Sequence, residues 1–129
     1  MGRLQDKRLF LLDMDGTIYL DDRLFDGVTA FLSRIREKGG RYLFLTNNSS
    51  HGTDAYIAKM KRLGIEAFPE DFLTSADAAV DYFRQNPSEG NIYVCGTESL
   101  KGQLRAAGLP VAASADDRVS AVLLGYDTE

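Results

Sequence analysis

Continuous apolar runs alternate along this chain with segments whose apolar residues recur every three or four positions. Runs of this kind are typical of strands in a parallel sheet, and the three-to-four spacing is typical of amphipathic helices. The predicted strands are 8–14, 41–46, 72–74, 91–95 and 119–124, and the predicted helices are 27–38, 99–107 and two that end at residues 63 and 85. This order predicts β-α-β units and therefore an α/β protein with a mainly parallel sheet.

Turn and capping residues refine these boundaries. Asp21 and Asp22 separate two short apolar segments, 18–20 and 24–25, which predicts a hairpin flap between the first strand and the first helix. Asp26 is expected to cap the helix over 27–38, and Ser75 is expected to cap the helix that ends at residue 85.

A linker is predicted at residues 86–90, which read Asn-Pro-Ser-Glu-Gly, because proline and glycine both interrupt regular structure. We therefore expect two domains, 1–86 and 87–129. The second would open with a β-α-β unit of its own.

The first predicted strand ends in two acidic residues, Asp13 and Asp15, followed by Gly16. The four residues before Asp13 are large and apolar, which predicts a strand buried on both faces. Side chains two positions apart share a face of a strand, so both carboxylates are expected to point beyond its C-terminal end, where open α/β sheets bind ligands. One carboxylate can attack an electrophile while its neighbour handles a proton, and a divalent cation can hold an anionic substrate.

A second polar cluster, Thr46 and Asn47 followed by further polar residues, ends the next predicted strand. Its hydroxyl and amide groups can donate hydrogen bonds to phosphoryl oxygens. Each cluster also has a purely structural interpretation, since Asp-Gly is a common turn and Thr, Asn and Ser often cap helices. Two such clusters at the same edge of one sheet favour a reaction site.

The segment Asp13-Met14-Asp15-Gly16-Thr17 resembles motif I of the haloacid dehalogenase superfamily, and Thr46 resembles its motif II. The longer matches Leu-Asp-Met-Asp-Gly-Thr-Ile-Tyr-Leu-Asp, Phe-Leu-Thr-Asn-Asn-Ser-Ser and Leu-Thr-Ser-Ala resemble the 4-nitrophenyl phosphatase branch, subfamily IIA. The resemblance implies that Asp13 is the nucleophile that becomes an aspartyl phosphate, and that Asp15 is the general acid and base. It implies that Asp13 and the backbone carbonyl of Asp15 bind Mg²⁺, and that Thr46 and Asn47 hold the phosphoryl group.

Two features of that family have no counterpart in this sequence. The family uses a further lysine and a distal acidic motif, often Gly-Asp, whereas this chain has no Gly-Asp dipeptide, and its lysines after Thr46 are Lys59, Lys61 and Lys101. The resemblance therefore implies an N-terminal fragment: half of a Rossmann-like three-layer core with parallel strands, plus the opening β-α-β unit of a cap domain. We expect such a chain to bind metal weakly, to turn over little or no substrate, and to self-associate through exposed core surfaces.

Composition narrows the function classes. The chain has 129 residues, 44% of them hydrophobic and 26% charged, and its net charge of −4 gives no reason to expect nucleic acid as a partner. No apolar stretch approaches the ~20 residues needed to span a bilayer, so a membrane is not an expected partner either. The single cysteine, Cys95, excludes an internal disulfide and is expected to be buried in a strand. We expect a cytoplasmic enzyme that acts on a small phosphorylated metabolite.

Two other functions are compatible with parts of the pattern. A non-catalytic module could retain the half-core for dimerisation or partner binding, although such a module would not need the acidic edge. A receiver-like domain also uses acids, Mg²⁺ and a threonine, but its phosphorylated Asp would end a central strand, and the segment 72–75 has none.

Overall fold

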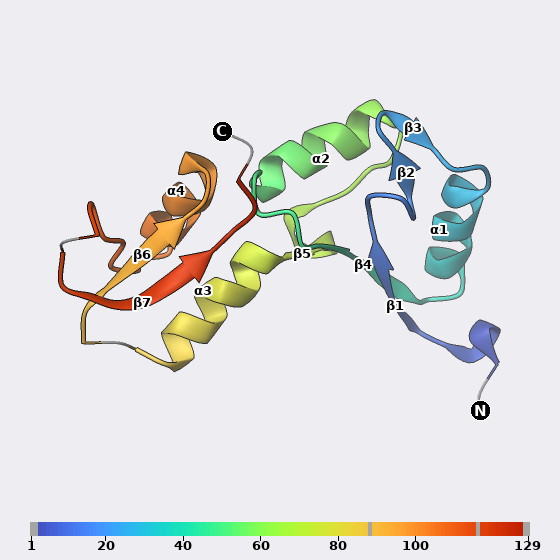
Figure 1. Ribbon diagram of the computed structural model, residues 1–129. Helices are drawn as coiled ribbons and strands as arrows, with labels where there is room; N and C mark the ends of the chain where they lie inside the picture. The colour runs from blue at the N-terminus through green and yellow to red at the C-terminus, as the bar shows by residue number, and fades with distance from the viewer. Residues whose placement is uncertain (1–2, 88, 116, 128–129) are drawn as a thin grey trace. The chain divides into compact units, whose positions relative to one another are not determined.

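The computed structural model describes residues 3–87, 89–115 and 117–127. Its strands are β1 (Leu9–Asp13), β2 (Tyr19–Leu20), β3 (Arg23–Leu24), β4 (Arg41–Thr46), β5 (Phe72–Thr74), β6 (Asn91–Cys95) and β7 (Val119–Leu124). Its helices are α1 (Val28–Glu37), α2 (Thr53–Arg62), α3 (Ser75–Gln85) and α4 (Glu98–Ala106), with short 3-10 helices η1 (Leu4–Asp6) and η2 (Pro69–Asp71) (Figure 1). The α/β class predicted from the sequence is confirmed.

The chain divides into two compact units. The first contains residues up to 46 together with 53–73, and the second contains 47–52 together with the residues from 74 onward. The expected division into domains 1–86 and 87–129 stays a prediction. None of the helices in the described ranges has the length and apolarity needed to cross a bilayer.

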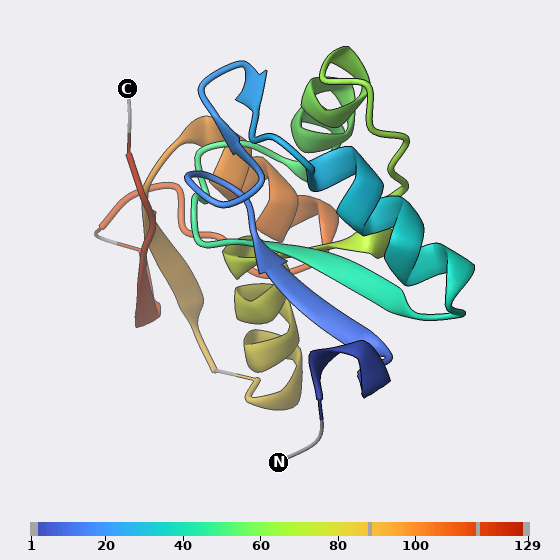
Figure 2. The ribbon, with the colours of Figure 1, turned by 90° about the vertical axis from the view of Figure 1, so that its right-hand side faces the viewer.

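The first unit is built on a three-stranded sheet of order β1-β4-β5. β1 and β4 are parallel, with Leu9 opposite Arg41 and Asp13 opposite Leu45. The strands β2 and β3 form the predicted hairpin, with Tyr19 opposite Leu24 and Asp21 in the left-handed conformation at its turn. Figure 2 shows β1 and β4 running in the same direction, with this hairpin beyond their C-terminal ends.

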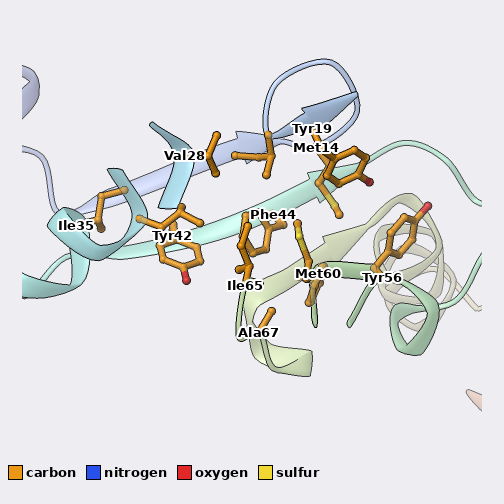
Figure 3. Packing of buried hydrophobic residues seen from close by; sticks show 13 residues of the cluster. Met14, Tyr19, Val28, Ile35, Tyr42, Phe44, Tyr56, Met60, Ile65 and Ala67 are labelled. Carbon is orange, nitrogen blue, oxygen red and sulfur yellow. The ribbon is translucent and has the colours of Figure 1, made fainter. Parts of the chain in front are cut away.

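The core of the first unit lies between the sheet, α1 and α2. Its buried residues are Met14, Ile18, Tyr19, Val28, Leu32, Ile35, Tyr42, Phe44, Tyr56, Met60, Ile65, Ala67 and Phe72. Phe44 is fully buried and lies between the rings of Tyr42 and Phe72, at centroid distances of 5.1 and 5.4 Å. In Figure 3, Met14, Tyr19 and Tyr56 lie at the end of this core toward which β4 runs, while Ile35 lies at the opposite end. The C-terminal edge of the sheet is therefore anchored by packed side chains.

The prediction that the first strand is buried on both faces is wrong for this chain. Leu9 and Leu11 on β1 are 57% and 58% exposed, whereas Phe10 and Leu12 pack against the core. The reason is that the core covers only one face of β1, the face that carries Phe10 and Leu12, and side chains along a strand alternate between its two faces.

The second unit contains the parallel pair β6 and β7, with Tyr93 opposite Val122 and Cys95 opposite Leu124. Ile92 and Val94 of β6 are buried with residues of α3 and α4, among them Leu100 and Leu104. Cys95 is exposed, contrary to the sequence-based prediction. The helices cover the face that carries Ile92 and Val94, and Cys95 lies one position out of phase with that face.

Two predicted caps are wrong by one residue. The N-cap of α1 is Gly27, with φ +85°, and no side chain caps this helix, so Asp26 does not have the expected role. The N-cap of α3 is Thr74, whose hydroxyl accepts from the Asp77 amide at 3.1 Å, while the Asp77 carboxylate accepts from the Thr74 amide at 2.9 Å. This reciprocal capping box satisfies donors at the helix start, and it displaces Ser75 into the first turn.

Candidate active site

Asp13 is the last residue of β1 and is exposed at the C-terminal edge of the first unit's sheet. The Thr17 hydroxyl donates to the Asp13 Oδ2 atom at a distance of 3.4 Å, so a residue of the following turn contacts the carboxylate. A carboxylate that is exposed and has a donor on one oxygen can meet an incoming electrophile with the other.

Asp15 is positioned by a turn, because β1 ends at Asp13. The Met14 carbonyl accepts from the amides of Thr17, Ile18 and Tyr19 at 3.2, 2.9 and 3.3 Å, and Gly16 has φ +83°. A glycine relieves the steric cost of that left-handed conformation. The expectation that Asp13 and Asp15 share one face of a strand therefore does not apply, although the Asp15 side chain is 58% exposed at the same edge.

Thr46 is the last residue of β4, the strand next to β1, and it is buried. Asp13 is opposite Leu45, so Thr46 is one register step further along the same edge, on the pleat face that carries Phe44. A hydrogen bond links the side chains of Thr46 and Tyr56. Burial raises the pKa of Tyr56, the Thr46 hydrogen bond lowers it, and the Asp15 charge raises it again.

Asn47 follows Thr46 directly but belongs to the second unit. Its carbonyl accepts from the Ser75 hydroxyl at 3.1 Å within that unit. Next to it, Asn48 Oδ1 accepts from the Ser50 amide at 3.0 Å, which closes an Asx turn. The roles assigned to Thr46 and Asn47 in phosphate binding stay predictions.

Two residues of α2 that the sequence analysis did not assign to the site lie at this edge. Lys59 Nζ is 4.0 Å from Asp15 Oδ1 and 3.8 Å from the centre of the Tyr19 ring. Tyr56, whose side chain is hydrogen-bonded to Thr46, precedes Lys59 by three positions. The side chains of Tyr56 and Lys59 are therefore on one face of the helix. The sequence contains this spacing, but a lysine and a tyrosine on a helix give no local signal of a site.

Tyr19 places a buried phenol beside these acids. Burial is the main cause that raises the pKa of its hydroxyl, and the negative charge of Asp15 raises it further. Among the described residues, the Tyr19 hydroxyl has no hydrogen-bond partner of ordinary geometry. The phenol therefore stays protonated and contributes no negative charge of its own to the acidic edge.

The chemistry of the donors at this edge is suited to a hard divalent cation. Asp13 and Asp15 offer only oxygen, which Mg²⁺ prefers, and Mg²⁺ commonly binds one or two protein carboxylates while it keeps several waters. In the described ranges, no group of three or more His, Cys, Asp or Glu side chains is arranged to hold a metal. These residues therefore suit a metal ion that is held by two protein residues and completes its coordination with water or substrate oxygens.

Comparison with known proteins identifies relatives of this chain. The model of a family described as haloacid dehalogenase-like hydrolase matches residues 10–110. Acid sugar phosphatase of Staphylococcus aureus is 31% identical over 126 residues, which are 98% of this chain and 48% of the relative. The chain therefore spans about half the length of the curated relatives it matches.

Solved structures give the same result for the fold. A 4-nitrophenylphosphatase from Thermotoga maritima has a TM-score of 0.86 and 34% identity, over 96% of this chain and 46% of that protein. A glycerol phosphate phosphatase from Mycobacterium tuberculosis, solved in complex with magnesium, has a TM-score of 0.84 and 33% identity, over 96% of this chain and 37% of that protein.

Proposed function

Because this chain belongs to the haloacid dehalogenase-like hydrolase family, we propose that it carries the phosphoryl-transfer residues of a Mg²⁺-dependent phosphomonoester hydrolase. The observation that supports the proposal most strongly is the position of Asp13. It is an exposed carboxylate at the end of β1, directly opposite Leu45 and next to the strand end that carries Thr46. Its neighbour Asp15 is exposed at the same edge.

The proposed reaction has two transfers. An Asp13 carboxylate oxygen attacks phosphorus, the bond from phosphorus to the ester oxygen breaks, and an aspartyl phosphate forms on Asp13. Protonated Asp15 gives its proton to the leaving alkoxide. A water molecule, deprotonated by Asp15, then attacks the phosphorus, the bond to Asp13 breaks, and inorganic phosphate leaves with both acids restored.

The other proposed roles concern charge and orientation. Asp13 and Asp15 would hold Mg²⁺, which when bound offsets the repulsion between the acids and an anionic phosphate. Thr46 and Asn47 would donate hydrogen bonds to the phosphoryl oxygens and hold the group in line with Asp13. With only the Asp13 carboxylate and the Asp15 backbone carbonyl as protein ligands, we expect metal binding to be weak.

The proposed substrate is a small phosphorylated metabolite in the cytoplasm. The relatives are named for sugar phosphates, glycerol phosphate and 4-nitrophenyl phosphate, which share a single phosphomonoester on a small leaving group. That shared chemistry is the class we propose for this chain.

Hydrolysis of 4-nitrophenyl phosphate tests the proposal, with and without Mg²⁺, on the unchanged chain and on Asp13→Asn. The matched control is Asp21→Asn, because Asp21 is exposed in the left-handed turn of the hairpin and asparagine tolerates that conformation. We expect slow, Mg²⁺-dependent release of 4-nitrophenol that is lost in Asp13→Asn and kept in Asp21→Asn. Equal release by Asp13→Asn, or release by the unchanged chain that does not depend on Mg²⁺, would contradict the proposal.

The second candidate, a self-associating module, is favoured by the exposed edge strand. β1 presents Leu9 and Leu11, both more than half exposed, beside backbone groups on the outer edge of the sheet. Edges of this kind pair readily with other chains. Sedimentation analysis of the unchanged chain and of Leu9→Lys would test this candidate, which predicts a concentration-dependent dimer that the substitution weakens. A monomer at all concentrations would refute it.

A further inference from the structure

The Lys59 ammonium contacts two parts of the candidate site at once. It is 4.0 Å from Asp15 Oδ1 and 3.8 Å from the Tyr19 ring centre, and its side chain is only 22% exposed. We propose that Lys59 is a positioning residue that fixes Asp15 against the β2–β3 hairpin and supplies positive charge for a bound phosphate. This inference rests on the proposed function, because it concerns the same acidic edge.

The first argument is geometric. An ammonium group is attracted to the face of an aromatic ring as well as to a carboxylate, so contacts on two sides restrict a side chain that is otherwise flexible. The Tyr19 amide is bonded to the Met14 carbonyl, and its own carbonyl accepts from the Gly16 amide at 2.8 Å. Lys59 therefore joins α2 to the turn that carries Asp15.

The second argument is electrostatic. Asp13 and Asp15 would both repel a phosphate dianion, and a partly buried cation reduces that repulsion more than an exposed one, because water screens it less. The other basic residues of the last turn of α2 are placed differently. Lys61 is exposed, and Arg62 lies 3.9 Å from Asp22, a carboxylate of the hairpin turn.

The third argument comes from Tyr19. Its hydroxyl is buried beside Asp15 without a hydrogen-bond partner of ordinary geometry among the described residues. Asp15 interacts with this hydroxyl, and Lys59 contacts the face of the same ring, so both side chains act on Tyr19. Loss of Lys59 should loosen Tyr19 and Asp15 together.

The test uses inorganic phosphate as the probe, titrated in the presence of Mg²⁺ and followed by ³¹P NMR. Lys59→Met removes the charge and keeps a long apolar side chain, Lys59→Arg keeps the charge, and Lys61→Met is the matched control on the same helix. We expect Lys59→Met to weaken phosphate binding about tenfold, Lys59→Arg to recover part of it, and Lys61→Met to bind as the unchanged chain does.

A second measurement needs no substitution. The Lys59 Nζ atom is 3.8 Å from the Tyr19 ring centre, so the ¹H resonances of the adjacent ε-carbon are expected upfield of ordinary lysine values. Ordinary values would overturn the proposal, as would equal phosphate binding by Lys59→Met and Lys61→Met.

Asp13→Asn separates this proposal from the proposed function. If Asp13→Asn loses Mg²⁺-dependent phosphate binding while Lys59→Met retains it, the role of Lys59 is refuted and that of Asp13 is supported. If the unchanged chain binds no phosphate with Mg²⁺, both proposals fall.

Discussion

Asp13 lies directly opposite Leu45 in the parallel pair formed by β1 and β4. This register brings Thr46, the next residue of β4, to the same edge of the sheet as the Asp13 carboxylate. The two residues come from strands separated by a complete helix in the sequence, so their proximity depends on the β-α-β connection. Because paired residues of parallel strands share a face, the Thr46 side chain is on the other pleat face from that of Asp13, and the two can contact one ligand only beyond the ends of the strands.

Gly16 is predicted to be required for the turn that positions Asp15. Its φ of +83° is costly for any residue with a Cβ atom, although a Cβ there would meet no heavy atom within 4 Å. Gly16→Ala should therefore lower the free energy of unfolding by about 1 kcal/mol through backbone strain alone. Urea unfolding of the two proteins measures this difference.

Gly102 provides the matched control for that substitution. It lies inside α4, and an added Cβ would also meet nothing within 4 Å. Gly102→Ala should stabilise the protein by about 0.5–1 kcal/mol, because alanine favours the helix. If both substitutions changed stability in the same direction, strain at Gly16 would not be the cause.

Thr74 is predicted to contribute more to α3 than Ser75 does. Thr74 is buried and forms both halves of the capping box with Asp77, whereas the Ser75 hydroxyl makes an exposed bond to the Asn47 carbonyl. Thr74→Ala should cost about 1 kcal/mol of unfolding free energy. Ser75→Ala should cost less than about 0.5 kcal/mol. A larger loss for Ser75→Ala than for Thr74→Ala would contradict this prediction and support Ser75 as the cap.

Stability is predicted to fall at alkaline pH partly because of Tyr42. Burial raises the pKa of its hydroxyl above the ordinary value of 10.0, although the nearby Arg36 guanidinium lowers it. The folded state then binds more protons than the unfolded state, so this contribution is complete below pH 10.0 and is lost as the pH rises toward the folded pKa.

Tyr42→Phe removes that contribution. The loss of unfolding free energy between about pH 8 and pH 11 should be smaller in Tyr42→Phe than in the unchanged chain. Tyr82→Phe, at a residue that is 61% exposed, is the control. An identical alkaline loss in the unchanged chain and in Tyr42→Phe would refute the role of Tyr42.

The strands were predictable because each is a short apolar run bounded by turn residues. The predicted segments 41–46, 72–74, 91–95 and 119–124 coincide with β4, β5, β6 and β7. The exposure of Leu9 was not predictable from the run itself, since the number of covered faces depends on which elements pack on the strand. Membership in the haloacid dehalogenase-like family was also predictable, because its motifs are local in sequence.

The site was predictable only in part, for a related reason. Asp13, Asp15 and Thr46 follow apolar runs directly, and the carboxyl ends of parallel strands share an edge of the sheet. Lys59 lies on a helix, where a charged residue ordinarily faces solvent, and its contacts with Asp15 and Tyr19 require the tertiary packing of α2. A side chain that reaches a site from a distant helix gives no local signal.

The proposed mechanism depends on Asp13 becoming phosphorylated. The direct measurement is mass spectrometry of the chain after a brief, acid-quenched reaction with 4-nitrophenyl phosphate and Mg²⁺, with the modified residue located by peptide mapping. A phosphoryl group on Asp13 that requires Mg²⁺ and is absent from Asp13→Asn is the predicted result. A chain that stays unmodified, or one that carries the group on another residue, would contradict the account.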